Sequence, residues 1–113
     1  MLAIRPAAVS GMFYPDDPIE LKRTVTDLLA TARAVESVRA PKALIVPHAG
    51  YIYSGPIAAS AYARLADLRG RIRRVVLLGP THRVYVRGLA LPDAERFATP
   101  LGEVITITTA CGN

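Results

Sequence analysis

The sequence predicts an α/β domain built around parallel strands, and three observations support this fold class. Two short, continuous apolar runs, residues 43–46 and 75–78, have the composition of strands that are buried on both faces. A stretch with helical periodicity separates them, so that strand, helix and strand follow one another as in a right-handed parallel βαβ unit. The chain has 113 residues, of which 51% are hydrophobic, so it has the size and composition of one domain with a buried core.

A first helix is expected to start in the segment "YPDDPIE", after an irregular or weakly extended start at residues 1–14. Asp17 is a good N-cap, Pro18 suits the first helical position, and Glu20 follows Asp17 by three residues as in a capping box. The helix is expected to run to about Ala34. Its apolar residues recur at helical spacing and predict one buried face; they are Leu21, Val25, Leu28, Leu29 and Ala32.

The crossover helix is expected to begin at Gly55-Pro56, after the first apolar run has ended at Pro47. Proline has no backbone N–H to donate to a strand ladder, so Pro47 ends the first strand and Pro80 lies just beyond the second. The helix carries apolar residues along one side, namely Ile57, Ala61, Leu65 and Leu68.

Beyond His82 the pattern changes to short strands. The segments "GLALP" and "GEVITITT" are expected to be strands, joined by the connection "DAERFATPLG". One βαβ unit and a hairpin make a thin α/β domain, so we expect further strands and helices to complete it. A sheet of this kind exposes an apolar edge and face, which predicts self-association.

The balance of basic and acidic residues indicates which kinds of binding partner the chain favours. Fourteen basic and nine acidic residues give a net charge of +5, which suits an anionic partner without requiring one. A basic cluster lacks interleaved aromatic residues and any nucleic-acid-binding motif, so nucleic acid is not predicted; its members are Arg64, Arg69, Arg71, Arg73 and Arg74.

Cysteine usage and hydropathy predict a cytoplasmic protein. Cys111 is the single cysteine, so no disulfide can form within the chain. The start of the chain lacks the apolar core of a signal peptide, because Arg5 and Pro6 interrupt it. No apolar run reaches the ~18 residues of a membrane span, so no membrane is predicted.

The two histidines of the chain occupy equivalent places. His48 follows the first apolar run and His82 follows the second, 34 positions later. Ligands of open α/β sheets bind beyond the carboxyl ends of the strands, and two imidazoles there can converge on one metal ion. The alternative is that both are turn residues whose rings bond nearby carbonyls. Asp93 and Glu95 are the nearby carboxylates, but their spacing is more typical of surface residues.

Tyr51 and Tyr53 follow His48 closely. In an extended segment both rings would point the same way, toward His48, where a phenol could donate a proton or hold a substrate oxygen. The alternative is that both rings cover the core. Ser54 is not expected to be a nucleophile, because "YSGP" is not a G-x-S-x-G elbow.

Four blocks of sequence resemble one family. The segments "VSGMFYPDD", "ALIVPHAGYIYSGPIAASAY", "VVLLGPTHR" and "FATPLGEV" occur in this order in the Memo family, whose bacterial and archaeal members are called AmmeMemoRadiSam system protein B. The resemblance extends from about Arg5 to Val104. It implies that residues 1–113 are the N-terminal portion of a single Memo-like domain.

The resemblance also implies a fold and a site. The family is similar in fold to class III extradiol dioxygenases, which use non-haem Fe(II) to open catechol rings. His48 and His82 match histidines of the pocket that corresponds to the iron site. Tyr53 matches a tyrosine of that pocket, Tyr51 lies beside it, and Phe13 matches an aromatic residue near its mouth.

The resemblance predicts an incomplete metal site in this chain. The later half of family members supplies another histidine and a cysteine or carboxylate, and Cys111 is not expected to replace them. Iron or copper is the expected metal. Three functions stay open: a metal-dependent oxidoreductase acting on a small organic molecule, a non-catalytic module that binds a peptide or small ligand in the same pocket, and, less favoured, metal-assisted hydrolysis.

Overall fold

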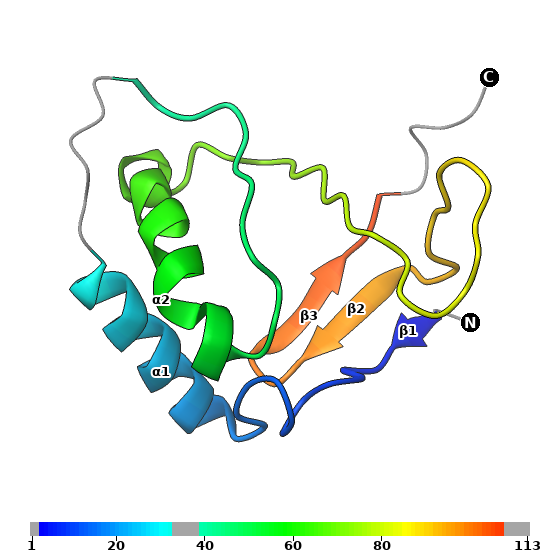
Figure 1. The fold of residues 1–113 in the computed structure, drawn as a ribbon, viewed down its shortest axis with the longest axis horizontal. Coiled ribbons are helices and arrows are strands. Elements are labelled where there is room, and N and C mark those ends of the chain that lie inside the picture. The colour runs from blue at the N-terminus through cyan, green and yellow to red at the C-terminus, as the bar shows by residue number, and fades with distance from the viewer. Residues whose placement is uncertain (1–2, 33–38, 108–113) are drawn as a thin grey trace.

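The computed structural model describes residues 3–32 and 39–107 and contains two packed helices and one small sheet (Figure 1). Helix α1 spans Pro18–Thr31, and α2 spans Tyr51–Tyr62 and continues as the 3-10 helix η1, Ala63–Leu68. The strands are β1, Ile4–Arg5, β2, Arg96–Thr99, and β3, Gly102–Ile105. The predicted α/β class is therefore confirmed.

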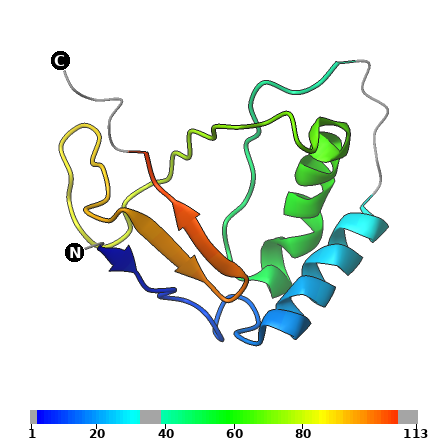
Figure 2. The ribbon, with the colours of Figure 1, turned by 180° about the vertical axis from the view of Figure 1, so that it is seen from behind.

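The sheet is mixed, with the strand order β1-β2-β3. The first two strands are parallel, with Arg5 opposite Phe97, and β2 and β3 form an antiparallel hairpin in which Thr99 lies opposite Gly102. The Thr99 hydroxyl donates to the Gly102 carbonyl at 2.7 Å, and Gly102 has a φ of +125°, which favours glycine. Figure 2 shows the hairpin turn lying next to the first turn of α1.

Helix α1 begins as the sequence predicts. The Asp17 side chain accepts a hydrogen bond from the Glu20 N–H at 2.9 Å, and Pro18 occupies the first helical position. The helix ends at Thr31, before the expected end at Ala34, which lies outside the described residues.

Helix α2 begins five residues earlier than predicted, at Tyr51 instead of Pro56. Gly50 is its N-cap, and Pro56 lies inside the helix instead of at its start. The early start has a tertiary cause, because the N–H of Tyr51 donates to the Phe13 carbonyl at 2.8 Å and satisfies a donor that a helix N-terminus leaves free. Pro56 lies inside the helix and has no N–H to donate to the carbonyl of Ile52, so one helical hydrogen bond is missing there.

The two helices approach closely at a glycine. A Cβ atom at Gly55 would lie 3.2 Å from Cδ1 of Leu28, so a larger residue would force that leucine to move. Leu21 and Ala59 are buried at 4% and 5% exposure, and they are the buried apolar residues of the part that the structure describes. The core therefore sits between α1 and α2.

The predicted parallel βαβ core is not present among the described residues. Residues 43–46 and 75–78 are not strands, and "GLALP" is irregular, whereas β2 forms in the expected connection. A strand is stable only when a neighbour pairs with its backbone, and β2 has β1 and β3 beside it. The two apolar runs have no such neighbour among the described residues.

None of the described helices is both long and apolar enough to cross a membrane.

The Asp17 cap gives a direct test of how α1 begins. Asp17→Ala should lower the free energy of unfolding by about 1 kcal/mol, because the Glu20 N–H loses its acceptor. Asp17→Asn keeps an acceptor and should retain most of the stability. Urea unfolding followed by circular dichroism measures both variants, and an equal loss in the two would contradict a capping role.

Candidate functional site

The structure brings the two histidines together. The Nε2 atoms of His48 and His82 lie 3.2 Å apart, and their ring centroids are 5.3 Å apart at an interplanar angle of 43°. Both side chains are exposed to solvent. They come from irregular segments 34 positions apart in the sequence, so their contact is a tertiary feature.

A hydrogen bond fixes the turn that carries His48. The Ser54 side chain is only 5% exposed, and its hydroxyl lies 2.7 Å from the Ala49 carbonyl and 3.2 Å from the Gly50 carbonyl. The hydroxyl has one hydrogen to donate, and the shorter distance favours Ala49. Ser54 therefore ties the first turn of α2 to the residue next to His48. The sequence does not predict this role of Ser54, because the contact depends on α2 beginning at Tyr51 and not at Gly55-Pro56.

The loop before α1 also holds the turn that carries His48, through a hydrogen bond between Phe13 and Tyr51. Gly11 has a φ of +82°, and the N–H groups of Met12 and Phe13 both reach the Val9 carbonyl, so this loop turns tightly. Phe13 then accepts the Tyr51 N–H through its carbonyl. The backbone of Phe13 is anchored beside the His48 turn, while its side chain remains exposed.

Tyr51 and Tyr53 do not point the same way, as an extended segment would require. Both belong to α2, where residues two positions apart diverge by about 200° around the helix axis. The Tyr51 ring packs against Tyr14 with centroids 5.7 Å apart, whereas Tyr53 is 80% exposed. Of the two phenols, Tyr53 is the one accessible to a ligand.

The environment of Tyr51 changes its acidity. Burial raises the pKa of the Tyr51 phenol above its ordinary value of 10.0, and the neighbouring Tyr14 and Tyr62 phenols raise it further. The neutral phenol is therefore the form that this packing favours.

The distance between the two histidines fits a shared metal ion. Two nitrogens that each bind one ion at ~2.1 Å and lie 3.2 Å apart subtend about 100° at the ion, between octahedral and tetrahedral angles. The same distance also fits an N–H···N hydrogen bond between neutral rings. The donor set is therefore suitable for two ligands of a transition metal.

Further ligands are not found beside the pair. No group of three or more histidine, cysteine or acidic residues that could hold a metal occurs within residues 3–32 and 39–107, so Asp93 and Glu95 do not complete a site. Cys111 lies outside the described residues. Among the described residues, the pair alone offers two nitrogen atoms to a metal.

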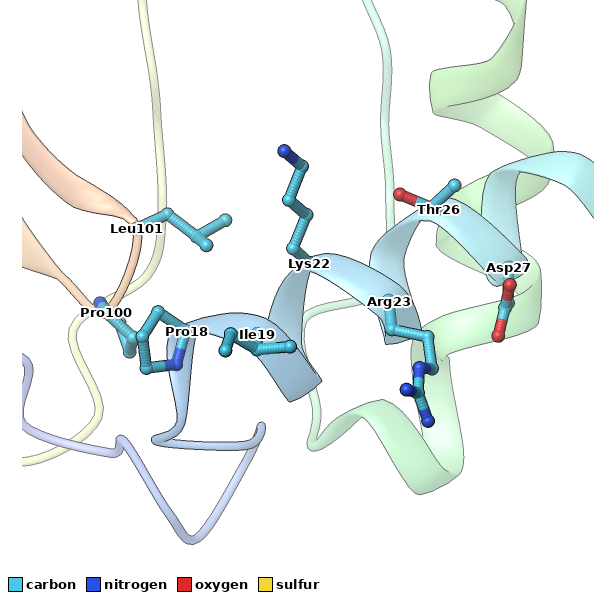
Figure 3. A pocket seen from close by; sticks show the side chains of 8 residues that line it. All are labelled: Pro18, Ile19, Lys22, Arg23, Thr26, Asp27, Pro100 and Leu101. Carbon is cyan, nitrogen blue, oxygen red and sulfur yellow. The ribbon is translucent and has the colours of Figure 1, made fainter.

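Two open grooves lie away from the histidine pair. One has a volume of about 500 Å³ and lies between α1 and the β2–β3 turn, where Pro18 and Ile19 meet Pro100 and Leu101 (Figure 3). The other, of about 470 Å³, lies between residues 43–47 and α2. Neither groove is lined by His48, His82 or Tyr53.

Comparison with known proteins identifies the family. The family model described as "Memo-like protein" matches residues 5–112. The chain belongs to this family. A MEMO1 family protein of Aquifex aeolicus is 40% identical over 103 residues, which cover 91% of this chain and 36% of the relative. The MEMO1 family protein MHO1 of Saccharomyces cerevisiae is 34% identical over 111 residues, which cover 97% of this chain and 32% of the relative.

The shared region is a limited part of these Memo-like relatives. The memo-1 homologue of Caenorhabditis elegans is 36% identical over 101 residues, which cover 89% of this chain and 28% of that protein. The chain thus spans about a third of the length of the curated relatives it matches.

Ser54→Ala tests whether the buried hydroxyl holds the His48 turn. We expect a loss of about 1–2 kcal/mol in the free energy of unfolding, because a buried carbonyl contact is removed. Ser60→Ala is the matched control, since its exposed hydroxyl also donates to a carbonyl of α2, that of Pro56. Thermal unfolding compares the two, and an equal effect would argue against a special role for Ser54.

Tyr51→Phe tests the effect of the raised pKa. Because the folded pKa is above the unfolded value, the unfolded chain releases this proton first. Stability is full below pH 10.0 and falls as the pH rises toward the folded pKa. Tyr51→Phe should remove the part of the stability loss at alkaline pH that comes from ionisation of Tyr51. Tyr53→Phe changes an exposed residue, so the same loss of stability should remain in that variant. Urea unfolding from about pH 9 to 11 measures the difference.

Proposed function

We propose that His48 and His82 form one side of an iron or copper site in a Memo-like domain. The observation that supports this proposal is the 3.2 Å separation of their Nε2 atoms. Imidazole is a good ligand for both metals, and sites with two histidines and one carboxylate are typical of non-haem Fe(II) enzymes. The further ligand would come from polypeptide outside the described residues.

The proposal also includes the arrangement of the two apolar runs. We propose that residues 43–46 and 75–78 become parallel strands in a fold similar to that of class III extradiol dioxygenases. Both runs are continuous and apolar, as such buried strands require. His48 and His82 would then lie beyond the carboxyl ends of these strands, where ligands of α/β sheets bind.

The residues of this chain have separate roles in the proposed site. His48 and His82 would hold the metal through Nε2, and the bound metal would supply Lewis-acid and redox chemistry. The exposed phenol of Tyr53 could donate a hydrogen bond to a substrate oxygen. Ser54 and the Phe13–Tyr51 hydrogen bond would position the His48 turn. The proposed activity is an oxidoreduction of a small organic molecule.

A second function uses the same side chains without a metal. The 3.2 Å distance also suits a hydrogen bond between the two rings, and both rings remain exposed. In that case His48, His82 and Tyr53 would bind a peptide or a small molecule without catalysis.

Metal binding by the histidine variants separates these two functions. Cu(II) is a useful probe, because pulsed electron paramagnetic resonance reports how many imidazoles bind it. We expect two in the unchanged chain, and we expect His48→Ala or His82→Ala to weaken binding at least about tenfold, or 1.4 kcal/mol.

The control keeps both histidines. Tyr85→Ala removes an exposed aromatic side chain and should leave Cu(II) binding unchanged. If the histidine variants bind Cu(II) as tightly as the Tyr85→Ala variant, the metal proposal is wrong. A ligand that binds in the presence of a chelator, and only while both histidines are present, would support the second function.

A further inference from the structure

We propose that a basic turn at the end of η1 binds the surface of an anionic phospholipid membrane. The basic turn is defined as residues 64–74, and its arginines are Arg64, Arg69, Arg71, Arg73 and Arg74. The contact is with the charged groups of lipid headgroups, and it requires no membrane-spanning helix. It is independent of the histidine pair and of any metal.

Positive charge is concentrated in the basic turn. Its eleven consecutive positions hold five of the fourteen basic residues of the chain and one acidic residue, Asp67, which gives this segment a net charge of +4. The whole chain has a net charge of +5, so the other 102 residues together contribute +1. The excess of arginine is therefore a local feature of this turn, and the general composition does not account for it.

The arginines of the basic turn have no acidic partner in the part of the chain that the structure describes. The ion pair found there joins Arg96 to Glu103 on the sheet, and all five arginines of the turn are exposed. Stabilisation of a helix end does not explain them either, because no basic residue lies in the last turn of α2 or of η1. Like charges this close repel one another, and an anionic partner would compensate them.

The backbone holds the basic turn in a defined shape. The N–H of Arg69 donates to the Ala66 carbonyl at 3.3 Å, and the N–H of Arg71 donates to the Leu68 carbonyl at 2.9 Å. Gly70, between them, has a φ of +79°, and a Cβ atom there would meet nothing within 4 Å. The turn is therefore tight and open to solvent, so its arginines are accessible to a large partner.

The basic turn and the turn that carries His48 lie at opposite ends of α2. His48 precedes the first residue of this helix, whereas the basic turn follows its last residue, Tyr62 (Figure 1). Twelve residues at ~1.5 Å each make α2 about 18 Å long. A membrane bound at the basic turn therefore does not cover the turn that carries His48.

An anionic membrane suits the basic turn better than a nucleic acid does. No aromatic residue occurs within residues 64–74, so unpaired bases have no ring on which to stack. The arginines lie in a short 3-10 helix and a turn, and not along an α-helix that enters a major groove. Ile72, which is 44% exposed, lies between two arginines and brings an apolar side chain to the headgroup boundary.

A flat partner also suits the shape of this surface. Neither of the two grooves described above is lined by residues 69–74, so an acidic peptide has no concave site along them. Clusters of four to eight basic residues are typical of contacts with anionic lipids, and each arginine near such a surface strengthens binding about fivefold. The five arginines of the basic turn fall within this range.

Sedimentation with vesicles tests the proposal on the full 113-residue chain, with EDTA present so that metal plays no part. The probes are vesicles of phosphatidylcholine alone and vesicles that also contain about 30% phosphatidylserine, an anionic lipid. We expect binding to the anionic vesicles to be at least about tenfold tighter. NaCl at about 1 M should abolish the difference, because salt screens charges at a surface.

Two variants of equal net charge locate the binding. The double variant Arg71→Gln/Arg73→Gln removes two charges from the basic turn and should bind anionic vesicles about 25-fold more weakly, at about fivefold per arginine. Lys22→Gln/Arg23→Gln is the matched control, because it removes two exposed charges from α1. The control should bind almost as tightly as the unchanged chain. Both double variants change exposed side chains and should keep the circular dichroism of the unchanged chain.

Three results would overturn the proposal. The first is binding to neutral vesicles that is as tight as binding to anionic vesicles, which would indicate apolar contact instead of charge. The second is an equal loss of binding in the two double variants, which would make the net charge of the chain the cause and not the basic turn. The third is a chain that stays in solution with anionic vesicles; if it then binds a short DNA duplex, nucleic acid is the partner.

Discussion

The close packing of α1 against α2 is the contact on which the rest of the described structure depends. At Gly55 a Cβ atom would lie 3.2 Å from Cδ1 of Leu28, so the helices pack closely there, and the buried apolar residues Leu21 and Ala59 belong to these two helices. Burying such side chains is the main favourable term in folding. The sheet has no comparable cover, since every residue of β3 is exposed.

The histidine turn is built onto this helix pair. Ser54 lies in the first turn of α2 and bonds to the Ala49 carbonyl, while Tyr51 bonds to the loop that leads into α1. The position of His48 is therefore set by the same elements that make the core. His82 has no such support, because residues 72–82 are irregular and exposed. The contact between the rings thus joins a well-anchored residue to a weakly anchored one.

Local sequence signals predict the structure correctly where they act over a few residues. The Asp17 cap and the Pro18 start of α1 follow from side-chain chemistry within one turn, and both are present. The strand predicted in "GEVITITT" is present as β3. It forms a hairpin with β2, and not with the predicted strand "GLALP". The predicted helix start at Gly55-Pro56 is wrong, because α2 begins at Tyr51, whose N–H donates to the carbonyl of Phe13, a residue distant in the sequence.

The sequence by itself determined the α/β class, the start of α1 and the placement of both histidines after apolar runs. These features depend on local periodicity, capping and composition, which are properties of short segments. Only the tertiary structure decided that the two imidazoles meet, that Tyr51 and Tyr53 diverge, and that residues 43–46 and 75–78 remain unpaired. Those outcomes depend on which neighbours a segment finds, and a strand without a neighbour cannot form however apolar its sequence is.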